Sequence, residues 1–237
     1  MLSIDGLANI RDLGGLSRRH GGLTPSGVFL RSETLDRVSA DGWQALHDHG
    51  VRTVIDLRRP DEVTGAVPAE ITRVCVDLDG TDDTEFWAPY EADGRWSTPL
   101  YYLPHLRDLP HRLTAVLDAV AAADDGAVLF HCAAGWDRTG LVAAVLLRAL
   151  DVTADDAAAD YLGSFANAET MAALHERSFH VDERHQVLER FGHTAESAFR
   201  EMYVGLDLHA WFDASAVAAP TRTAVTTWRG AANPGDA

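Results

Sequence analysis

Apolar residues recur along the chain in two patterns that predict different elements. Short runs rich in β-branched residues predict strands, and they lie at residues 27–31, 51–57, 71–78 and 127–131. Apolar residues spaced three and four positions apart predict helices, and these lie at residues 39–49, 111–123, 139–150 and 153–163, with further helical stretches to about residue 203. Because strands and helices alternate, the pattern predicts an α/β fold with a mainly parallel central sheet flanked by helices.

Local signals indicate where these elements end and what connects them. Ser39 is a good N-cap, and Gly50 terminates the helix that follows it. Residues 79–99 are polar, aromatic and rich in turn residues, so we expect a mobile lid or a rim insertion there. Residues 218–237 are rich in Ala, Thr, Gly and Pro, and we expect them to form a flexible tail after a single domain at residues 1–217.

Composition and charge narrow the class of protein. A chain of 237 residues with 46% hydrophobic residues has enough apolar side chains for a sizeable core. No apolar run approaches the ~18 residues of a membrane-spanning helix, and residues 1–6 lack the basic start and apolar stretch of a secretory signal. The net charge of −16 disfavours nucleic acid and anionic membrane surfaces as partners. We therefore expect a cytoplasmic protein without stable membrane association.

The cysteines and histidines predict neither disulfides nor a cofactor. Cys75 and Cys132 are the two cysteines, too few for a disulfide framework. Cys75 lies in an apolar strand pattern, where core packing is the default and a role as resolving thiol for Cys132 is the alternative. No metal-ligand spacing stands out among the 11 histidines, so we expect no metal site.

The segment with the clearest chemistry runs from His131 to Gly140 and reads His-Cys-Ala-Ala-Gly-Trp-Asp-Arg-Thr-Gly. It follows a predicted strand and precedes a predicted helix. Five residues separate Cys132 from Arg138, and they can curl so that successive backbone N–H groups surround an anion. Arg138 offers a planar fork of donors to two phosphate oxygens. The spacing therefore predicts a site for a phosphate dianion with a nucleophile beneath it.

Each position of this loop has an expected role. Gly135 supplies a backbone conformation that a side chain would hinder. Helix N-termini and nearby cations stabilise a thiolate, so we expect Cys132 to be ionised, with the Thr139 hydroxyl donating to its sulfur. The backbone N–H groups that hold phosphate come from Ala133, Ala134, Gly135 and Trp136. Most cysteines are inert packing, and Cys-x5-Arg spacing also arises by chance. The neighbouring His131 and Thr139-Gly140 favour the catalytic interpretation.

The loop resembles the signature of the cysteine-dependent protein tyrosine phosphatase superfamily, and more narrowly its bacterial tyrosine and lipid phosphatase subgroup. Residues 9–15, Asn-Ile-Arg-Asp-Leu-Gly-Gly, resemble the N-terminal signature of that subgroup. Residues 51–58, Val-Arg-Thr-Val-Ile-Asp-Leu-Arg, resemble its Asp-Leu-Arg strand, and Asp160-Tyr161-Leu162 also fits. The resemblance covers about residues 5–205 and implies a protein tyrosine phosphatase-like fold and a phosphocysteine intermediate.

The resemblance also implies further site residues. Many relatives take a general acid from a Trp-Pro-Asp loop, and no such triplet occurs here. Asp137 is then the expected acid, with orienting Arg138 or capping the helix as the alternative. Asp56 and Arg58 are expected to edge the pocket, where Arg58 contacts substrate phosphate or pairs with Asp56 or Glu62.

One position departs from the subgroup, which usually has lysine where this chain has Trp136. Losing that positive charge argues against phosphoinositide substrates. An aromatic ring suits stacking on a phenyl ring or a nucleobase. The alternative is a rim tryptophan that only packs on a neighbouring loop.

Together these residues predict a metal-independent phosphomonoesterase that acts on phosphotyrosine protein or a related aryl or alkyl phosphate. A small-molecule phosphate, such as a nucleotide or a biosynthetic intermediate, is the alternative substrate, and a phosphoinositide is a weaker one. A non-catalytic phosphate-binding module is a different class, which the intact Cys132 and Arg138 disfavour. A rhodanese or arsenate reductase lacks support, because arsenate reductases generally need further redox cysteines and only Cys75 is available.

Overall fold

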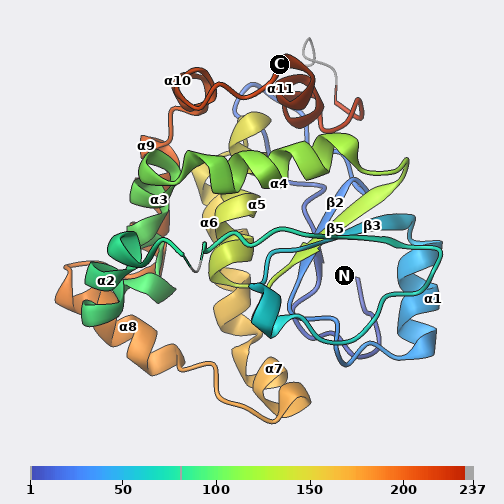
Figure 1. Cartoon of the computed structure of the whole chain (residues 1–237), viewed down its shortest axis with the longest axis horizontal. Coiled ribbons are helices and arrows are strands. Elements are labelled where there is room, and N and C mark those ends of the chain that lie inside the picture. Colours follow the sequence, from blue (N-terminus) through green and yellow to red (C-terminus); the bar gives the residue numbers. More distant parts are fainter. Residues whose placement is uncertain (1, 81, 233–237) are drawn as a thin grey trace.

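The computed structural model describes residues 2–80 and 82–232, and its strands form one five-stranded sheet in the order β1-β2-β5-β3-β4. The strands are β1 (Arg11–Asp12), β2 (Phe29–Ser32), β3 (Val51–Asp56), β4 (Thr72–Cys75) and β5 (Ala127–His131). β1 runs antiparallel to β2, and the other neighbouring strands are parallel. The predicted α/β fold with a mainly parallel sheet is thereby confirmed. Because β5 is the central strand, the loop that follows it leaves from the middle of the sheet (Figure 1).

Helices account for most of the remaining chain. The α-helices are α1 (Ala40–Asp48), α2 (Thr84–Asp93), α3 (Tyr102–Asp108), α4 (Pro110–Ala122), α5 (Asp137–Ala149), α6 (Ala154–Ala166), α7 (Ala168–His175), α8 (Val181–Arg190), α9 (Ala195–Gly205), α10 (Leu208–Ala214) and α11 (Ala219–Thr226). Three short 3₁₀ helices are η1 (Pro60–Glu62), η2 (Arg95–Ser97) and η3 (Pro99–Tyr101). Ser39 accepts a hydrogen bond from Gly42 N–H and caps α1 as expected.

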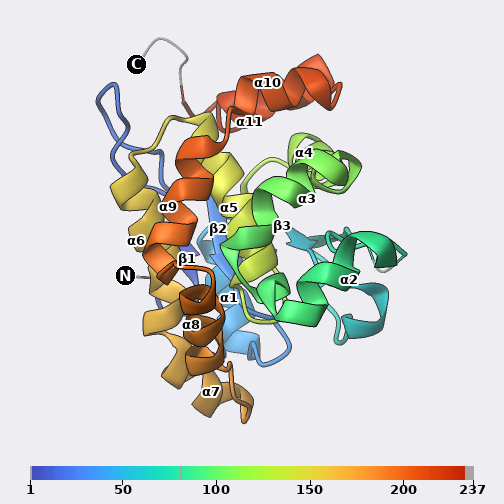
Figure 2. The same ribbon diagram turned by 90° about the vertical axis from the view of Figure 1, so that its left-hand side faces the viewer.

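Side chains of the central strands alternate between two apolar cores, because successive residues of a strand face opposite sides. Val128 and Phe130 of β5 belong to the larger core, which also contains the buried residues of α4, α5 and α6. Leu129 belongs to the smaller core with Leu46 of α1 and Val54 of β3. α5 runs through the middle of the molecule in both views (Figures 1 and 2), so the helix that follows the loop is anchored in the larger core.

The segment after residue 217 differs from the expected flexible tail. α11 packs beside α4, and the Trp228 ring is fully buried with an edge-to-face contact to Phe29 at 5.1 Å between ring centroids. The Trp228 Nε1–H donates to the carbonyl of Leu146 at 3.0 Å. Burial of this one large aromatic side chain, whose N–H donor is satisfied, orders the segment although its composition is rich in Ala and Gly. The tail prediction is therefore wrong for residues 218–232, and residues 233–237 lie outside the described part.

Residues 82–99 also fold, with α2 and η2 around an aromatic cluster. The Trp87 ring makes edge contacts with Phe86 and Tyr101, and its Nε1–H donates to the carbonyl of Asp79 at 2.7 Å. This segment is a structured wall at the carboxyl edge of the sheet. Cys75 is exposed on β4, the edge strand, so the expectation of core packing for that cysteine is wrong.

Candidate active site

The loop between β5 and α5 is held from outside through its carbonyl groups. The carbonyls of residues 133–135 accept hydrogen bonds from Thr34 N–H, Asn9 Nδ2 and Arg31 Nη2 at 2.9 to 3.2 Å. In a trans peptide the N–H points away from the carbonyl, so the N–H groups of these peptides point to the opposite side. α5 begins directly after them, at Asp137. A row of such N–H groups at a helix N-terminus is a nest for an anion.

Gly135 is required at its position, as the sequence predicts. Its φ of +65° lies in the left-handed region, and a Cβ there would come within 2.4 Å of the Ser32 backbone. Any larger residue would push the loop away from β2. The bend therefore depends on both the conformation and the small size of glycine.

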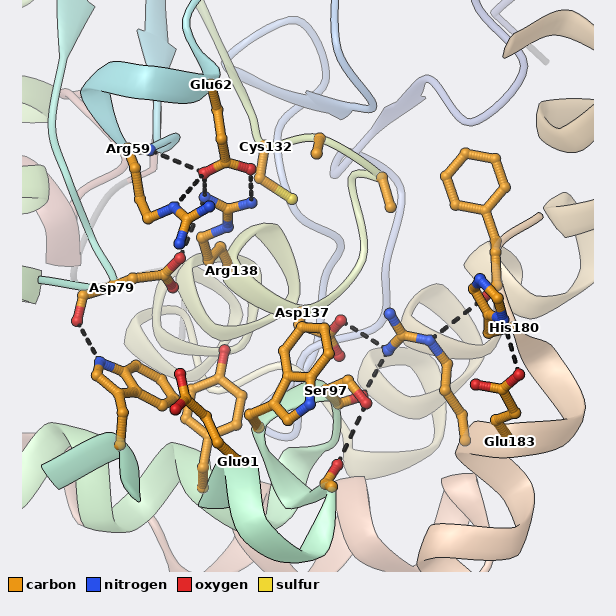
Figure 3. Close-up of a pocket in the computed structure, with 18 of the residues that line it drawn as sticks. Arg59, Glu62, Asp79, Glu91, Ser97, Cys132, Asp137, Arg138, His180 and Glu183 are labelled. Carbon is orange, nitrogen blue, oxygen red and sulfur yellow. Dashed lines mark hydrogen bonds and ion pairs between the residues drawn. The ribbon is translucent and has the colours of Figure 1, made fainter. Parts of the chain in front are cut away.

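Cys132 and Arg138 line the same pocket, which has a volume of about 880 Å³ (Figure 3). Cys132 is 3% exposed, which shields its sulfur from solvent on all sides but the pocket. Ala133 and Ala134 also line the pocket. The structure thus brings the predicted nucleophile and the predicted phosphate-binding arginine together.

Two carboxylates hold the Arg138 guanidinium in one orientation. Nη1 and Nη2 donate to the Glu62 carboxylate at 2.6 and 2.9 Å, and Asp79 Oδ2 lies 3.2 Å from Nη1 (Figure 3). Burial opposes ionisation of Glu62, but the hydrogen bonds from Arg138 outweigh it and lower the pKa of Glu62 to about 2. Guanidinium carries five N–H donors, so donors remain for a phosphate oxygen.

Asp137 lines the pocket and pairs with an arginine from a distant helix. Arg184 Nη1 of α8 donates to Asp137 Oδ2 at 2.6 Å, and the pair is largely buried. Burial raises the pKa of Asp137, although Arg184 opposes that shift. A carboxyl group that keeps its proton more readily than a free aspartate is suited to the acid role, which stays a prediction.

Trp136 occupies neither of the two positions expected for it. Its ring is fully buried, in edge contact with Phe165 at 4.2 Å between centroids, and the Arg184 guanidinium lies 4.5 Å above its centre. The ring therefore cannot stack on a substrate, and it is not a rim residue. Its cation–π contact instead supports the arginine that reaches Asp137.

Asp56 and Arg58 are buried and are not among the residues that line the pocket. Arg58 Nε and Nη2 each donate to the fully buried Asp56 carboxylate at 2.9 Å, and Arg73 also pairs with it. His131 Nε2 lies 3.6 Å from the same carboxylate. Burial lowers the pKa of His131 to about 4. The structural option for Arg58 is the one observed, and this ion-paired cluster supports the strand that delivers the loop.

Thr139 is buried in the first turn of α5. Its hydroxyl has no hydrogen-bond partner among the described residues, so the expected bond to the Cys132 sulfur is not formed in this structure. Donation from Thr139 to the sulfur stays a prediction for the substrate complex.

Sequence reasoning missed much of the pocket wall, which includes Arg59, Glu62, Asp79, Trp96, Tyr101, Arg177 and Arg184. Asp79 had a usable signal, because it directly follows the predicted strand 71–78. Its side chain therefore reaches the same carboxyl edge of the parallel sheet as Cys132. Arg177 and Arg184 had no local signal, because only the packing of α8 and of the segment between α7 and α8 brings them to the loop.

Residues 2–80 and 82–232 contain neither a metal-holding cluster nor a membrane-spanning helix. No group of three or more His, Cys, Asp or Glu side chains is arranged to hold a metal ion within these ranges. No helix within them is long and apolar enough to cross a membrane.

Comparisons with known proteins agree with the geometry of the loop. Residues 2–213 match the model of the tyrosine phosphatase family. A putative tyrosine-protein phosphatase of Cupriavidus necator is 34% identical over 173 residues, which cover 69% of this chain and 62% of that protein. A tyrosine-protein phosphatase of Nostoc commune is 34% identical over 131 residues, covering 52% of this chain and 43% of that protein.

A third relative is the triple specificity protein phosphatase PtpB of Mycobacterium tuberculosis. It is 31% identical over 194 residues, which cover 68% of each chain. This chain thus spans less than two thirds of the Cupriavidus and Nostoc proteins. The match to the family model nevertheless extends over most of the sequence, from the N-terminal segment that braces the loop to α10. The chain belongs to the tyrosine phosphatase family.

Proposed function

We propose that this chain is a cysteine-dependent phosphomonoesterase whose substrate is phosphotyrosine. The observation that carries the proposal is the meeting of Cys132 and Arg138 in one pocket, at a loop whose carbonyls at residues 133–135 accept hydrogen bonds from Thr34, Asn9 and Arg31. A thiolate, a row of N–H groups and a guanidinium are the parts that phosphoryl transfer to sulfur needs. The names of the relatives support tyrosine phosphate as the substrate.

The reaction follows from these parts in two steps. The Cys132 thiolate attacks phosphorus, the S–P bond forms and the ester P–O bond breaks. Asp137 gives its proton to the leaving oxygen, while Arg138 and the loop N–H groups hold the equatorial oxygens. Water then attacks phosphorus and gives a proton to a carboxylate, and the S–P bond breaks to restore the thiolate.

The charges that line the pocket favour a simple monoester over a polyanionic lipid. The arginines that line it are Arg59, Arg138, Arg177 and Arg184, and the carboxylates are Glu62, Asp79, Glu91, Asp137 and Glu183. Carboxylates therefore offset the arginines, and a head group with several phosphates gains little from this surface. We expect phosphotyrosine peptides to be hydrolysed faster than phosphoinositides.

The experiment that tests the proposal measures phosphate release from phosphotyrosine peptide. Cys132→Ser should lower turnover by on the order of a thousandfold or more, because the nucleophile is lost. Cys75→Ser is the matched control and should leave turnover unchanged, since Cys75 is exposed on the edge strand. Turnover by the Cys132→Ser variant near the unmodified rate would overturn the mechanism. Phosphoserine peptide, phosphoinositide and nucleotide substrates in the same assay rank the alternatives.

A further inference from the structure

Asp79 places a second carboxyl group beside Arg138, and the mechanism above does not use it. The Glu62 carboxylate already binds Nη1 and Nη2 of that guanidinium, and Asp79 Oδ2 lies 3.2 Å from Nη1. Asp79 lines the pocket in the loop after β4, where its carbonyl accepts the Trp87 Nε1–H at 2.7 Å. An ionised Asp79 therefore faces the same cation that a phosphate dianion would bind.

The charges around Asp79 disfavour a further negative charge near it. Arg138 of α5 and Arg59, the residue before η1, interact with it as cations, whereas Glu62 of η1 and Asp77 of its own loop interact with it as carboxylates. The phenol of Tyr101, on η3, also interacts with it and is fully buried. Burial raises the pKa of Asp79 to about 6, with Glu62 and Asp77 adding to the rise and Arg138 opposing it.

A dianion bound in the loop adds two negative charges to the charged side chains around Asp79. Like charges at close range favour the neutral form of a carboxyl group, so Asp79 is the side chain on which a proton relieves most repulsion. Asp137 differs, because it pairs with Arg184 at 2.6 Å rather than with Arg138, the cation that would bind the dianion. Glu62 differs as well, because both of its oxygens accept hydrogen bonds from Arg138.

We propose that Asp79 takes up a proton when a phosphate dianion binds beside Arg138, so that anion binding in this loop is a proton-coupled step. The proton comes from solvent and stays on the Asp79 carboxyl group while the dianion is bound. It returns to solvent when phosphate leaves. The proposal rests on the proposed function only in requiring that the loop hold a phosphate-like dianion.

Coupling of this kind acts in both directions. If the dianion favours protonation of Asp79, protonation of Asp79 favours the dianion by the same factor. The affinity for the dianion should be highest below about pH 6, which is the pKa of Asp79 when no dianion is bound. It should fall as the pH rises above that value. The fall approaches about tenfold per pH unit as long as the bound form stays protonated.

The test uses sulfate as the probe, because it is tetrahedral like phosphate and stays a dianion throughout this pH range. The full-length Cys132→Ser protein serves as the parent, which removes the thiol as a proton acceptor. Calorimetric titration in two buffers of different ionisation enthalpy, at pH values from 5.5 to 8, gives both the affinity and the number of protons taken up. We expect net proton uptake near pH 7 and an affinity that falls with pH.

Asp79→Asn in this parent should abolish the uptake and make the affinity independent of pH. Because asparagine resembles the protonated carboxyl group, sulfate should bind this variant about tenfold or more tightly than the parent at pH 8. Misfolding cannot produce tighter binding.

Asp83→Asn is the matched control for charge, since Asp83 pairs with Arg112 at 2.9 Å, and it should leave the uptake intact. Asp137→Asn tests another carboxyl group of the pocket and should also retain uptake.

Three outcomes would overturn the proposal. They are uptake that persists in Asp79→Asn, uptake that disappears in Asp137→Asn instead, and sulfate that fails to bind or binds the parent without uptake. His180 also lines the pocket, and the Asp79→Asn comparison accounts for it because that variant leaves His180 in place. A failure of the proposed function is distinct, because it would appear as a protein that takes up a proton with sulfate but does not hydrolyse phosphotyrosine.

Discussion

The floor and the wall of the pocket are built in different ways. The floor, residues 132–138, is one contiguous loop that hydrogen bonds to its carbonyls and the packing of α5 hold in place. The wall combines η1, residues 79–80, residues 84–101 and residues 177–187, and these segments are far apart in the sequence. Ion pairs join the two, from Arg138 to Glu62 and from Arg184 to Asp137. The chemistry is therefore specified locally, while its protonation and orientation are set by distant segments.

Because the floor and the wall are built differently, we expect substitutions in the two regions to have different effects. A buried floor side chain supports the fold as well as the site, so replacing it should cost stability. A wall side chain with partial exposure should change rates or affinities and leave the fold intact. The four predictions below test this division, from the largest expected effect to the smallest.

Trp136→Lys should lower the free energy of unfolding by about 3 kcal/mol or more, because truncating a buried tryptophan costs about that much and a buried charge adds to it. Denaturant unfolding measures the change. Trp96→Lys is the matched control, since Trp96 is 53% exposed on the wall, and it should change stability by less than about 0.5 kcal/mol. Similar losses from the two substitutions would break the distinction between floor and wall.

Asp137→Asn should slow hydrolysis of substrates with basic leaving groups, such as alkyl phosphates, by about a hundredfold. Nitrophenyl phosphate, whose leaving group needs little protonation, should slow much less. The ratio of the two kcat/KM values, for the variant and for the unmodified protein, is the measurement. Equal slowing of both substrates would restrict Asp137 to holding Arg184 in place.

Glu62→Gln should lower kcat/KM about tenfold, because Arg138 loses the charged partner that orients it. It should also change the dependence of stability on pH. The lowered pKa of Glu62, about 2, means that its ion pair stabilises the fold above the ordinary glutamate range and is lost as the pH falls toward 2. Acid unfolding of the variant should therefore lack this contribution. An unchanged acid transition and an unchanged kcat/KM would show that Arg138 is oriented without Glu62.

Trp96→Ala should raise KM for aryl phosphates by about threefold and leave kcat unchanged, since an exposed ring at the rim offers contact area but no chemistry. Inorganic phosphate, as a competitive inhibitor without a ring, should bind the variant and the unmodified protein equally. A large fall in kcat would place Trp96 in the reacting part of the site.

The elements that the sequence determined are those with a strong local pattern. The apolar run 127–131 became β5 with the same bounds, and the N-cap Ser39 starts α1 as expected. The loop from Cys132 to Arg138 was also predictable, because its spacing, its glycine and its strand-to-helix context are all encoded within ten residues. Packing nevertheless decided where its tryptophan points.

The remaining features were decided by contacts between residues far apart in the chain. Burial of Trp228 against Phe29 ordered a segment whose composition predicts a tail. Arg184 reaches Asp137 across 47 positions, and Arg138 reaches Glu62 across 76. A local pattern cannot encode such pairs, because each depends on how whole helices pack and on which charges that packing buries. The sequence by itself predicted the nucleophile and the phosphate loop, whose Cys132 and Arg138 line one pocket, and the tertiary structure alone decided which charges surround them.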